Sequence, residues 1–372
     1  MLVTLIKTAN SFDNNLGFSV LNPIIFGGHM IIINKNKPFY IDKKNKVIRM
    51  GNFTGTGKEI EYDDESLLSI FNNVQKPISK KDLVKKVHLE TSVSEEEIED
   101  AIDYLMEEHF IIDYDKYQTL IHDEKYNRQN LFFSMFNDNY VLYNKCFKGK
   151  NILILGLGGI GSNVAITLER AGFNDFTIVD CDVVEESNLI RQYPYNSEDI
   201  GKQKTEALKE KLKESQVKSK NLKITNEDDI IEEIISSDFV LCTVDKPQRI
   251  IRRLINKICV QNNKPVLFCG FSEYVAMIGP FIEPKTTACL SCIEKENSEI
   301  PINNVELVPS FGPLCLLISS IVSNEIINYF SKYKESNLIG QTLMFDLLTY
   351  QTNIINWEKN SKCKECGKDA SK

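Results

Sequence analysis

The chain has 372 residues, of which 42% are hydrophobic and 26% are charged, and its formal net charge is −8 at pH 7. This composition is ordinary for a globular protein with a large core and about two domains, and a negative charge without a basic stripe argues against a nucleic-acid partner. The sequence has no signal-peptide pattern and no run of 18 apolar residues, so we expect a cytoplasmic protein without a membrane span.

The first part of the chain, residues 1–120, is predicted to be a small α+β domain. Three helical patterns and a strand-like segment, Phe110–Ile112, follow an opening set of short strands. This order of hairpin, three helices and strand predicts a winged-helix-like domain. The opening strands are separated by Asn/Lys turns, which predicts a hairpin or small sheet over residues 30–34, 38–41 and 46–50.

The three helices have recognisable starts. The first covers Glu65–Asn73, the second begins at Ser79, and the third begins at Ser94, where Glu97 completes a capping box. The third helix, SEEEIEDAIDYLMEEH, is strongly acidic, whereas a winged helix that binds DNA presents Lys and Arg there. Two functions stay open on the residues alone: binding of an extended peptide by strand addition beside the third helix, or packing and dimerisation.

A connecting segment is predicted over residues 121–150. It begins with a polar stretch, IHDEKYNRQN, and continues with an aromatic one, LFFSMF. Arg128 lies in the polar stretch. On the residues alone, a surface ion pair with Asp123 or Glu124 is the ordinary interpretation of this arginine.

The stretch NILILGLGGIGSNVAITLER, residues 151–170, has the pattern of a buried strand, a glycine turn and a helix. Gly156, Gly158 and Gly161 have G-x-G-x-x-G spacing, and Gly172 is the predicted stop of the helix. Glycines allow a tight turn and a close approach of the backbone to a phosphate, while the helix N-terminus supplies N–H donors. The stretch therefore predicts a nucleotide-binding site.

The strand that follows, residues 176–180, ends in Asp180. This aspartate comes about 20 residues after the glycines, where a carboxylate holds a ribose hydroxyl in such sites. The motif alone leaves the nucleotide open among NAD, FAD, ATP and S-adenosylmethionine.

The remaining pattern of residues 151–372 predicts a doubly wound, Rossmann-like, mostly parallel α/β sheet with an added antiparallel part. The expected helices are residues 200–212, 247–262 and 314–330, and the expected strands are residues 222–225, 239–243, 265–271, 275–282 and 342–348, of which the last two are the candidates for antiparallel strands.

Polar and cationic residues follow the strand that carries Asp180. Asn188, Arg191 and Lys204 supply one amide and two cations near the strand end, where ligands bind in such sheets. Two cations fit a triphosphate better than a nicotinamide. Asp245, at the end of a later buried strand, is a candidate ligand of Mg²⁺ and also a candidate helix N-cap, and both roles can hold together.

Two C-x-x-C pairs stand out among the ten cysteines: Cys289 with Cys292, and Cys363 with Cys366. Without an export signal, such pairs indicate metal rather than disulfides. Four thiolates in two pairs suit tetrahedral zinc with no open ligand position, so we expect a structural zinc site.

Taken together, these motifs resemble those of the ubiquitin-activating-enzyme-like (ThiF/MoeB/HesA-type) adenylyltransferases. The resemblance covers residues 126–372 and rests on KYNRQ at 125–129, GLGGIGS at 156–162, SNLIRQ at 187–192, IGKQK at 200–204 and CTVD at 242–245, together with the paired cysteines. It implies ATP and Mg²⁺ as cofactors, a homodimer, and a carboxylate substrate that becomes an acyl-adenylate as pyrophosphate leaves.

The resemblance also assigns roles to individual residues. It implies that Asp180 holds the ribose, that Asp245 holds the magnesium ion, and that Arg128 enters the phosphate site of the partner subunit. The implied catalytic residues are Arg128, Arg191, Lys204 and Asp245, and the implied nucleotide-binding residues are Gly156, Gly158, Gly159, Gly161, Asp180, Asp182, Asn188, Arg191 and Lys204.

Residues 1–120 depart from the sulfur-carrier activators of this family, which begin near the KYNRQ motif. The added domain resembles the leader-peptide-recognition domain of microcin-type peptide adenylases. We therefore expect an ATP-dependent enzyme of peptide antibiotic biosynthesis that adenylates a carboxylate on a ribosomally made precursor peptide. The alternatives are an activator of a sulfur-carrier protein in thiamine or molybdopterin synthesis and, more distantly, an NAD-dependent Rossmann oxidoreductase.

Overall fold

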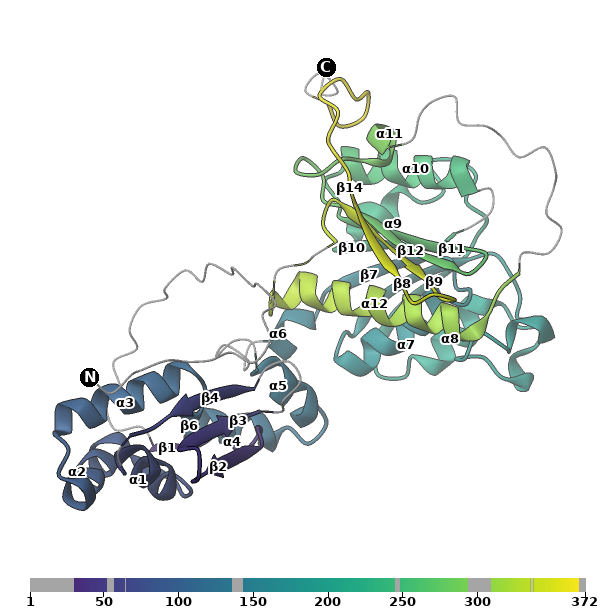
Figure 1. The fold of residues 1–372 in the computed structure, drawn as a ribbon. Helices are drawn as coiled ribbons and strands as arrows, with labels where there is room; N and C mark the ends of the chain where they lie inside the picture. Colours follow the sequence, from purple (N-terminus) through teal and green to yellow (C-terminus); the bar gives the residue numbers. More distant parts are fainter. Residues whose placement is uncertain are drawn as a thin grey trace. The chain divides into compact units, whose positions relative to one another are not determined.

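The computed structural model describes residues 30–51, 57–63, 65–135, 143–244, 248–293, 309–334, 336 and 338–367 (Figure 1). The chain divides into two compact units, Met1–Val141 and Leu142–Lys372. Each unit has a hydrophobic core of its own.

Two small antiparallel sheets form in the N-terminal unit. In the first sheet β1 lies between β5 and β6, and in the second β3 lies between β2 and β4. The three strands expected near the start of this unit are confirmed, but the first of them belongs to a different sheet from the other two. The strands are β1 (Met30–Ile33), β2 (Phe39–Asp42), β3 (Val47–Met50), β4 (Lys58–Glu61), β5 (Ile78–Ser79) and β6 (Ile111–Asp113).

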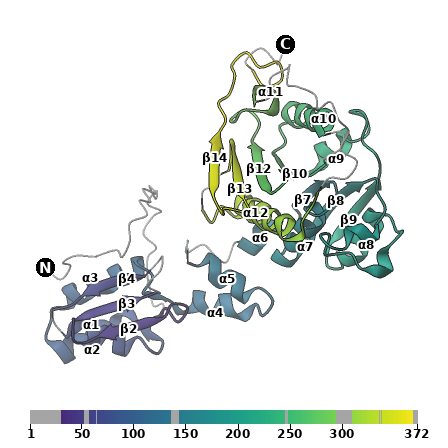
Figure 2. The ribbon, with the colours of Figure 1, turned by 45° about the vertical axis from the view of Figure 1, so that its right-hand side comes forward.

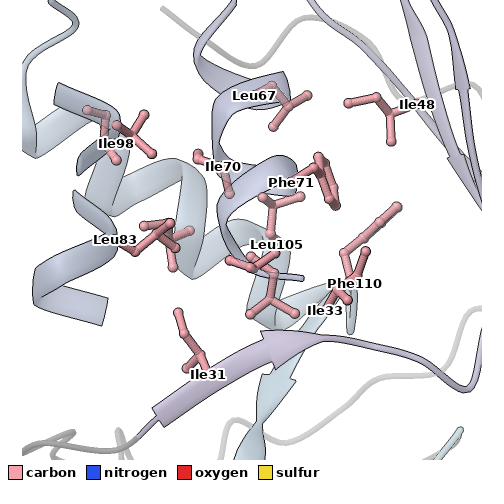
Figure 3. Packing of buried hydrophobic residues seen from close by; sticks show 14 of the residues in the cluster. Ile31, Ile33, Ile48, Leu67, Ile70, Phe71, Leu83, Ile98, Leu105 and Phe110 are labelled. Atoms are coloured by element: carbon pink, nitrogen blue, oxygen red, sulfur yellow. The ribbon is translucent and has the colours of Figure 1, made fainter. Parts of the chain in front are cut away.

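Three helices pack their apolar faces on the core of this unit. Figure 3 shows Ile70, Leu83 and Leu105, one from each helix, around Ile31 of β1 and Phe110. These side chains are almost completely buried, and burying each contributes about 1.5–3 kcal/mol. The helices are α1 (Ser66–Asn73), α2 (Lys80–Thr91) and α3 (Glu95–Glu107).

Side-chain caps start α2 and α3 where the sequence predicts them. The hydroxyl of Ser79 accepts a hydrogen bond from the amide of Asp82, and that of Ser94 accepts one from the amide of Glu97. The Glu97 carboxylate accepts a 2.8 Å hydrogen bond from the Ser94 hydroxyl. The capping box is therefore formed only in its first half, and a cap of this kind stabilises a helix by about 1 kcal/mol.

Two helices that the sequence analysis did not predict follow β6. The first, α4 (Tyr114–His122), packs against β1 and β6, and the second, α5 (Asn127–Phe133), packs against α4. Both lie in the N-terminal unit.

The second unit is built on one eight-stranded sheet in the order β14-β13-β12-β11-β10-β7-β8-β9. The run from β11 to β9 is parallel, as expected, and β12, β13 and β14 are antiparallel additions, of which the sequence analysis predicted β12 and β13 but not β14. The strands are β7 (Asn151–Leu155), β8 (Asp175–Asp180), β9 (Gln216–Asn221), β10 (Phe239–Cys242), β11 (Val266–Ser272), β12 (Val275–Ile282), β13 (Gln341–Asp346) and β14 (Thr352–Asn356).

Helices cover both faces of this sheet. Figure 2 shows α9 and α10 on one side and α7 and α12 on the other. Ile234 of α9 and Ile255 of α10 pack with Leu153, Val240 and Phe268 of the sheet. The helices are α6 (Tyr143–Phe147), α7 (Gly161–Ala171), α8 (Lys204–Lys211), α9 (Ile231–Ser236), α10 (Gln248–Gln261), α11 (Leu290–Ile293) and α12 (Gly312–Ser331).

Two sequence-based assignments are wrong in this unit. The strand expected at residues 222–225 is not formed, and the strand of this region is β9, which ends at Asn221. β9 is a polar edge strand, so its composition gives no strand signal. Leu222 and Ile224, which suggested a strand, pack on the core from a loop. The helix expected from residue 200 starts only at Lys204, because Gly201 has φ +88° and interrupts a continuous helix.

The helix α12 is long and apolar enough to cross a membrane by length and composition, although 56% of its most apolar window is buried within the chain. It packs on α6, α7, β11 and β12. These contacts make α12 a core helix of the second unit.

Candidate functional site

The glycine turn between β7 and α7 is held by close contacts with β10. Gly156 has φ +90°, and a Cβ there would lie 2.8 Å from Oγ1 of Thr243. The Thr243 hydroxyl is 2.9 Å from the carbonyl oxygen of Gly156, to which it donates. A Cβ on Gly161 would lie 2.0 Å from that same oxygen. Both glycines are therefore required by the fold itself.

The two middle glycines differ from each other. A Cβ on Gly159 would lie 2.8 Å from Sγ of Cys315 in α12, so that glycine is required by helix packing. A Cβ on Gly158 would meet no atom within 4 Å. Gly158 thus faces open space just before the N-terminus of α7, where backbone N–H groups favour an anion.

Asp180, at the end of β8, is joined to the glycine turn. Its Oδ2 accepts a 2.6 Å hydrogen bond from the amide of Leu157, and its Oδ1 accepts one of 2.8 Å from the amide of Asp182. Burial raises the pKa of the Asp180 carboxyl, and the nearby charge of Lys204 opposes this shift. A carboxylate fixed in this way is oriented to receive further donors, such as ribose hydroxyls.

Lys204 and Asp182 form an ion pair beside this carboxylate. Nζ of Lys204 lies 3.0 Å from Oδ2 of Asp182, with 7% of the lysine side chain exposed and 64% of the aspartate side chain. The ligand atoms of Asp180, Cys181 and Asp182 lie within 4.8 Å of one another. The lysine already supplies positive charge to this acidic group.

Asn188 and Arg191 are organised by a short 3₁₀ helix, Glu186–Asn188. The Asn188 side chain is buried, and its oxygen accepts a hydrogen bond from the amide of Glu185. The Arg191 guanidinium donates a 2.6 Å hydrogen bond to the carbonyl of Ser187. Burial raises the pKa of the Cys315 thiol, and the charge of Arg191 partly opposes this shift. Arg191 therefore lies close to the glycine turn, which Cys315 approaches at Gly159.

Two further residues support this region and were missed by the sequence analysis. The hydroxyl of buried Tyr195 lies 3.1 Å from the carbonyl of Leu157 and 3.4 Å from that of Lys204. Burial raises the Tyr195 pKa strongly, so this hydroxyl stays protonated and can donate. The second supporting residue is Thr243, whose hydroxyl donates to the carbonyl of Gly156. A tyrosine in a loop and a threonine after a strand carry no distinctive signal by themselves.

Two predicted catalytic residues are not placed beside this site by the structure. Asp245 lies outside the described residues. Arg128 lies on α5 in the N-terminal unit, where its side chain is exposed.

The four predicted zinc ligands come together in the second unit. The sulfur atoms of Cys289, Cys292, Cys363 and Cys366 all lie within 4.8 Å of one another. The shortest separations are 3.3 Å between Cys292 and Cys366 and 3.6 Å between Cys289 and Cys363. Four converging thiols with no other ligand type match the donor set of a structural zinc ion.

Three comparisons connect this geometry to known proteins. A model described as the ThiF family matches residues 126–365. The sulfur carrier protein ThiS adenylyltransferase of Escherichia coli is 27% identical over 223 residues, which are 58% of this chain and 85% of that protein. The molybdopterin-synthase adenylyltransferase of the same organism is 25% identical over 249 residues, which are 65% of this chain and 96% of that protein.

Solved structures extend the likeness to the N-terminal unit. E. coli MccB with ATP has a TM-score of 0.77 at 24% identity and covers 91% of this chain and 100% of its own. E. coli MccB with selenomethionyl MccA has the same TM-score at 23% identity, with 91% and 99% covered. At this level of identity the likeness shows a shared fold, and 91% of the chain includes most of both units.

Proposed function

The chain belongs to the ThiF family and is an ATP-dependent adenylyltransferase, and from that premise we propose that it adenylates a carboxylate on a ribosomally made precursor peptide. The product would be an acyl-adenylate, with pyrophosphate released, in the maturation of a peptide antibiotic. The observation that carries the proposal is the N-terminal unit: the fold of MccB covers 91% of this chain, whereas the ThiF family model matches only residues 126–365.

The residues of the glycine turn suit the nucleotide end of this reaction. The open space at Gly158 and the N-terminus of α7 receive phosphate oxygens, while Asp180 holds the ribose. Arg191 and Lys204 offset the charge that develops on the phosphates as an oxygen of the substrate carboxylate attacks the α-phosphorus and pyrophosphate leaves. Catalysis is then positional and electrostatic, without a protein nucleophile.

Two parts of the proposal rest on the sequence alone. Asp245 would hold a magnesium ion, which would offset negative charge on the phosphates, and Arg128 would reach the phosphates of a partner subunit in a homodimer. The zinc ion proposed for the four cysteines would have a structural role, because four thiolates leave no open position.

The N-terminal unit offers a defined place for an extended peptide. β4 pairs with β3 on one side only among the described strands. Lys58 of β4 forms an ion pair with Glu108, directly after α3, so the acidic helix borders this sheet edge. An added strand would pair with the β4 backbone and present its side chains to α3, which favours a leader with basic or amide-rich character. The exposed acidic residues of α3 are Glu95, Glu96, Glu97, Glu99, Asp100, Asp103 and Glu107.

The experiment compares binding of a synthetic precursor peptide to the full chain and to two triple variants of equal charge change. Glu99→Gln/Asp100→Asn/Asp103→Asn removes charge from α3, and Asp228→Asn/Glu232→Gln/Glu358→Gln removes it from the second unit. We expect weaker binding, at least about tenfold, only for the α3 variant, and weaker binding of the unaltered protein at higher salt. Equal affinity for all three proteins would remove α3 from the peptide site.

A sulfur carrier is the second candidate substrate, because both E. coli relatives are named for sulfur-carrier or molybdopterin-synthase adenylation. The ThiF family model begins at residue 126, so that candidate leaves most of the N-terminal unit without a role in substrate binding. Membership of the ThiF family favours ATP over the NAD alternative.

A further inference from the structure

Arg252 of α10 lies against the parallel sheet of the second unit. Its guanidinium carbon is 5.0 Å from the centre of the Phe268 ring on β11. Phe268 pairs in register with Cys242, the last residue of β10, and Cys242 pairs on its other side with Leu155, the last residue of β7. The glycine turn begins directly after Leu155. Arg252 therefore lies near the carboxyl ends of the parallel strands, where the glycine turn also lies, and on the side of the turn away from β8.

This guanidinium has no acceptor among the residues that the structure describes. Its Nε is shut off from solvent and makes no hydrogen bond, and the side chain as a whole is half-buried. Lys257, on the same helix, is by contrast paired with Glu227 at 2.9 Å. A half-buried guanidinium whose buried Nε–H has no acceptor would be stabilised by an anion.

The neighbouring thiols do not supply that anion. Burial raises the pKa of both thiols, Cys242 and Cys269, and the charge of Arg252 opposes the shift in each. Burial is the larger effect and raises the pKa of Cys242 to about 11. Both thiols are thus neutral at physiological pH, and neither of them offsets the charge of Arg252.

The groups proposed above to hold the nucleotide gather on the opposite side of the turn. Asp180 ends β8, Lys204 begins α8 beside it, and Arg191 lies near Cys315 of α12. Adenylation brings a second anion, the substrate carboxylate, to the α-phosphate. A carboxylate that approaches over the ends of β10 and β11 would meet Arg252 before it meets the nucleotide.

We propose that Arg252 binds the carboxylate of the substrate and positions it for attack on ATP. A guanidinium offers two parallel N–H donors to the two oxygens of a carboxylate, a geometry that lysine does not reproduce. The cation–π contact with the Phe268 ring helps to hold the guanidinium in place. The inference rests on the adenylating activity and not on the identity of the peptide.

The test observes the arginine side chain directly. The sequence contains only seven arginines, so protein labelled with ¹⁵N-arginine gives few Nε–H signals, and the buried Nε of Arg252 exchanges slowly with water. Arg252→Lys identifies the signal, and Arg253→Lys, on the next residue, is the matched control. The probes are N-acetylglycine, a minimal peptide carboxylate, and N-acetylglycinamide, which differs from it only in lacking the charge. Each is titrated with and without the ATP analogue AMPCPP and Mg²⁺.

We expect N-acetylglycine to shift the Arg252 signal saturably, more strongly with AMPCPP bound, while N-acetylglycinamide leaves it in place. A shift caused by AMPCPP alone, with nothing added by N-acetylglycine, would make Arg252 a phosphate ligand and overturn the proposal. Absence of any shift would overturn it as well. Because no peptide is used, a negative result here is distinct from failure of the peptide proposal.

A second measurement uses catalysis. With a peptide that the enzyme accepts, Arg252→Lys should raise the KM for peptide by about tenfold or more and leave the affinity for ATP unchanged. Arg253→Lys should change neither value. An equal loss of ATP affinity in Arg252→Lys would contradict a role confined to the carboxylate.

Discussion

Nζ of Lys204 lies 3.0 Å from Oδ2 of Asp182, and the two partners differ in their exposure, because the lysine side chain is nearly buried while the aspartate side chain is open to solvent. The exposed carboxylate can move away at little cost, whereas the lysine is fixed. The pair thus holds a positive charge ready at the edge of the proposed nucleotide site.

The first prediction concerns that lysine. Lys204→Gln should lower kcat/KM for ATP by a factor on the order of 10², because a preorganised cation is lost from the phosphate site. Thermal stability should change little, since the abandoned Asp182 is exposed. Lys202→Gln is the control: Lys202 pairs with Asp199 and Glu210 outside the site. Comparable kinetic losses in both variants would argue against a specific role for Lys204.

The glycines of the turn allow a sharper separation of fold from function. Gly158→Ala should fold with an unchanged melting temperature, because its Cβ would meet no protein atom, but should bind ATP at least about tenfold more weakly if phosphate approaches there. Gly161→Ala should destabilise the whole unit, because its Cβ would lie 2.0 Å from the carbonyl oxygen of Gly156. Calorimetric ATP titration and thermal melting measure the two effects. Full ATP affinity in a stable Gly158→Ala protein would place the phosphates elsewhere.

The cysteine cluster predicts one zinc ion per chain. Cys363→Ser should lose the metal and melt at a lower temperature, because the site ties the segment near the C-terminus to α11. Elemental analysis measures the zinc content. Cys181→Ser, outside the cluster, should keep it. A metal-free preparation with unchanged melting would remove zinc from the account.

A mixing experiment tests the proposed exchange of Arg128 between subunits. Arg128→Ala and Asp245→Asn should each be nearly inactive as homodimers, because each lacks one half of the phosphate site. Co-refolded heterodimers should regain activity, since one of their two sites contains both Asp245 and the partner's arginine. No recovery in verified heterodimers would place Arg128 in its own subunit or outside catalysis.

Sequence reasoning reached the parallel sheet and its glycine turn because both leave strong local patterns. The residues of β7 from Ile152 to Leu155 are all apolar, and Gly156 and Gly161 are required by contacts that no other residue permits. The paired cysteines were found for the same reason, since their spacing reflects the chemistry of their ligand. Helices and strands with such local signals can be predicted without knowledge of the tertiary structure.

The parts that sequence reasoning missed depend on tertiary context. β9 is a polar edge strand, stabilised by pairing with β8 rather than by its own composition. Thr243 and Tyr195 became recognisable only when the fold brought their hydroxyls to the carbonyls of the glycine turn. Arg252 was passed over because an arginine in an amphipathic helix is normally a solvated charge, and only the structure shows that its buried Nε has no acceptor among the described residues.

The most direct test of the central claim is ATP–pyrophosphate exchange by the full chain with two kinds of substrate. One kind is the set of synthetic peptides encoded by short reading frames beside the gene, and the other is the sulfur-carrier proteins of the same organism. We expect ATP–pyrophosphate exchange that depends on a peptide and is absent with the carrier proteins. Mass spectrometry of that peptide should then reveal its modification. Exchange with a carrier protein and none with any peptide would contradict it.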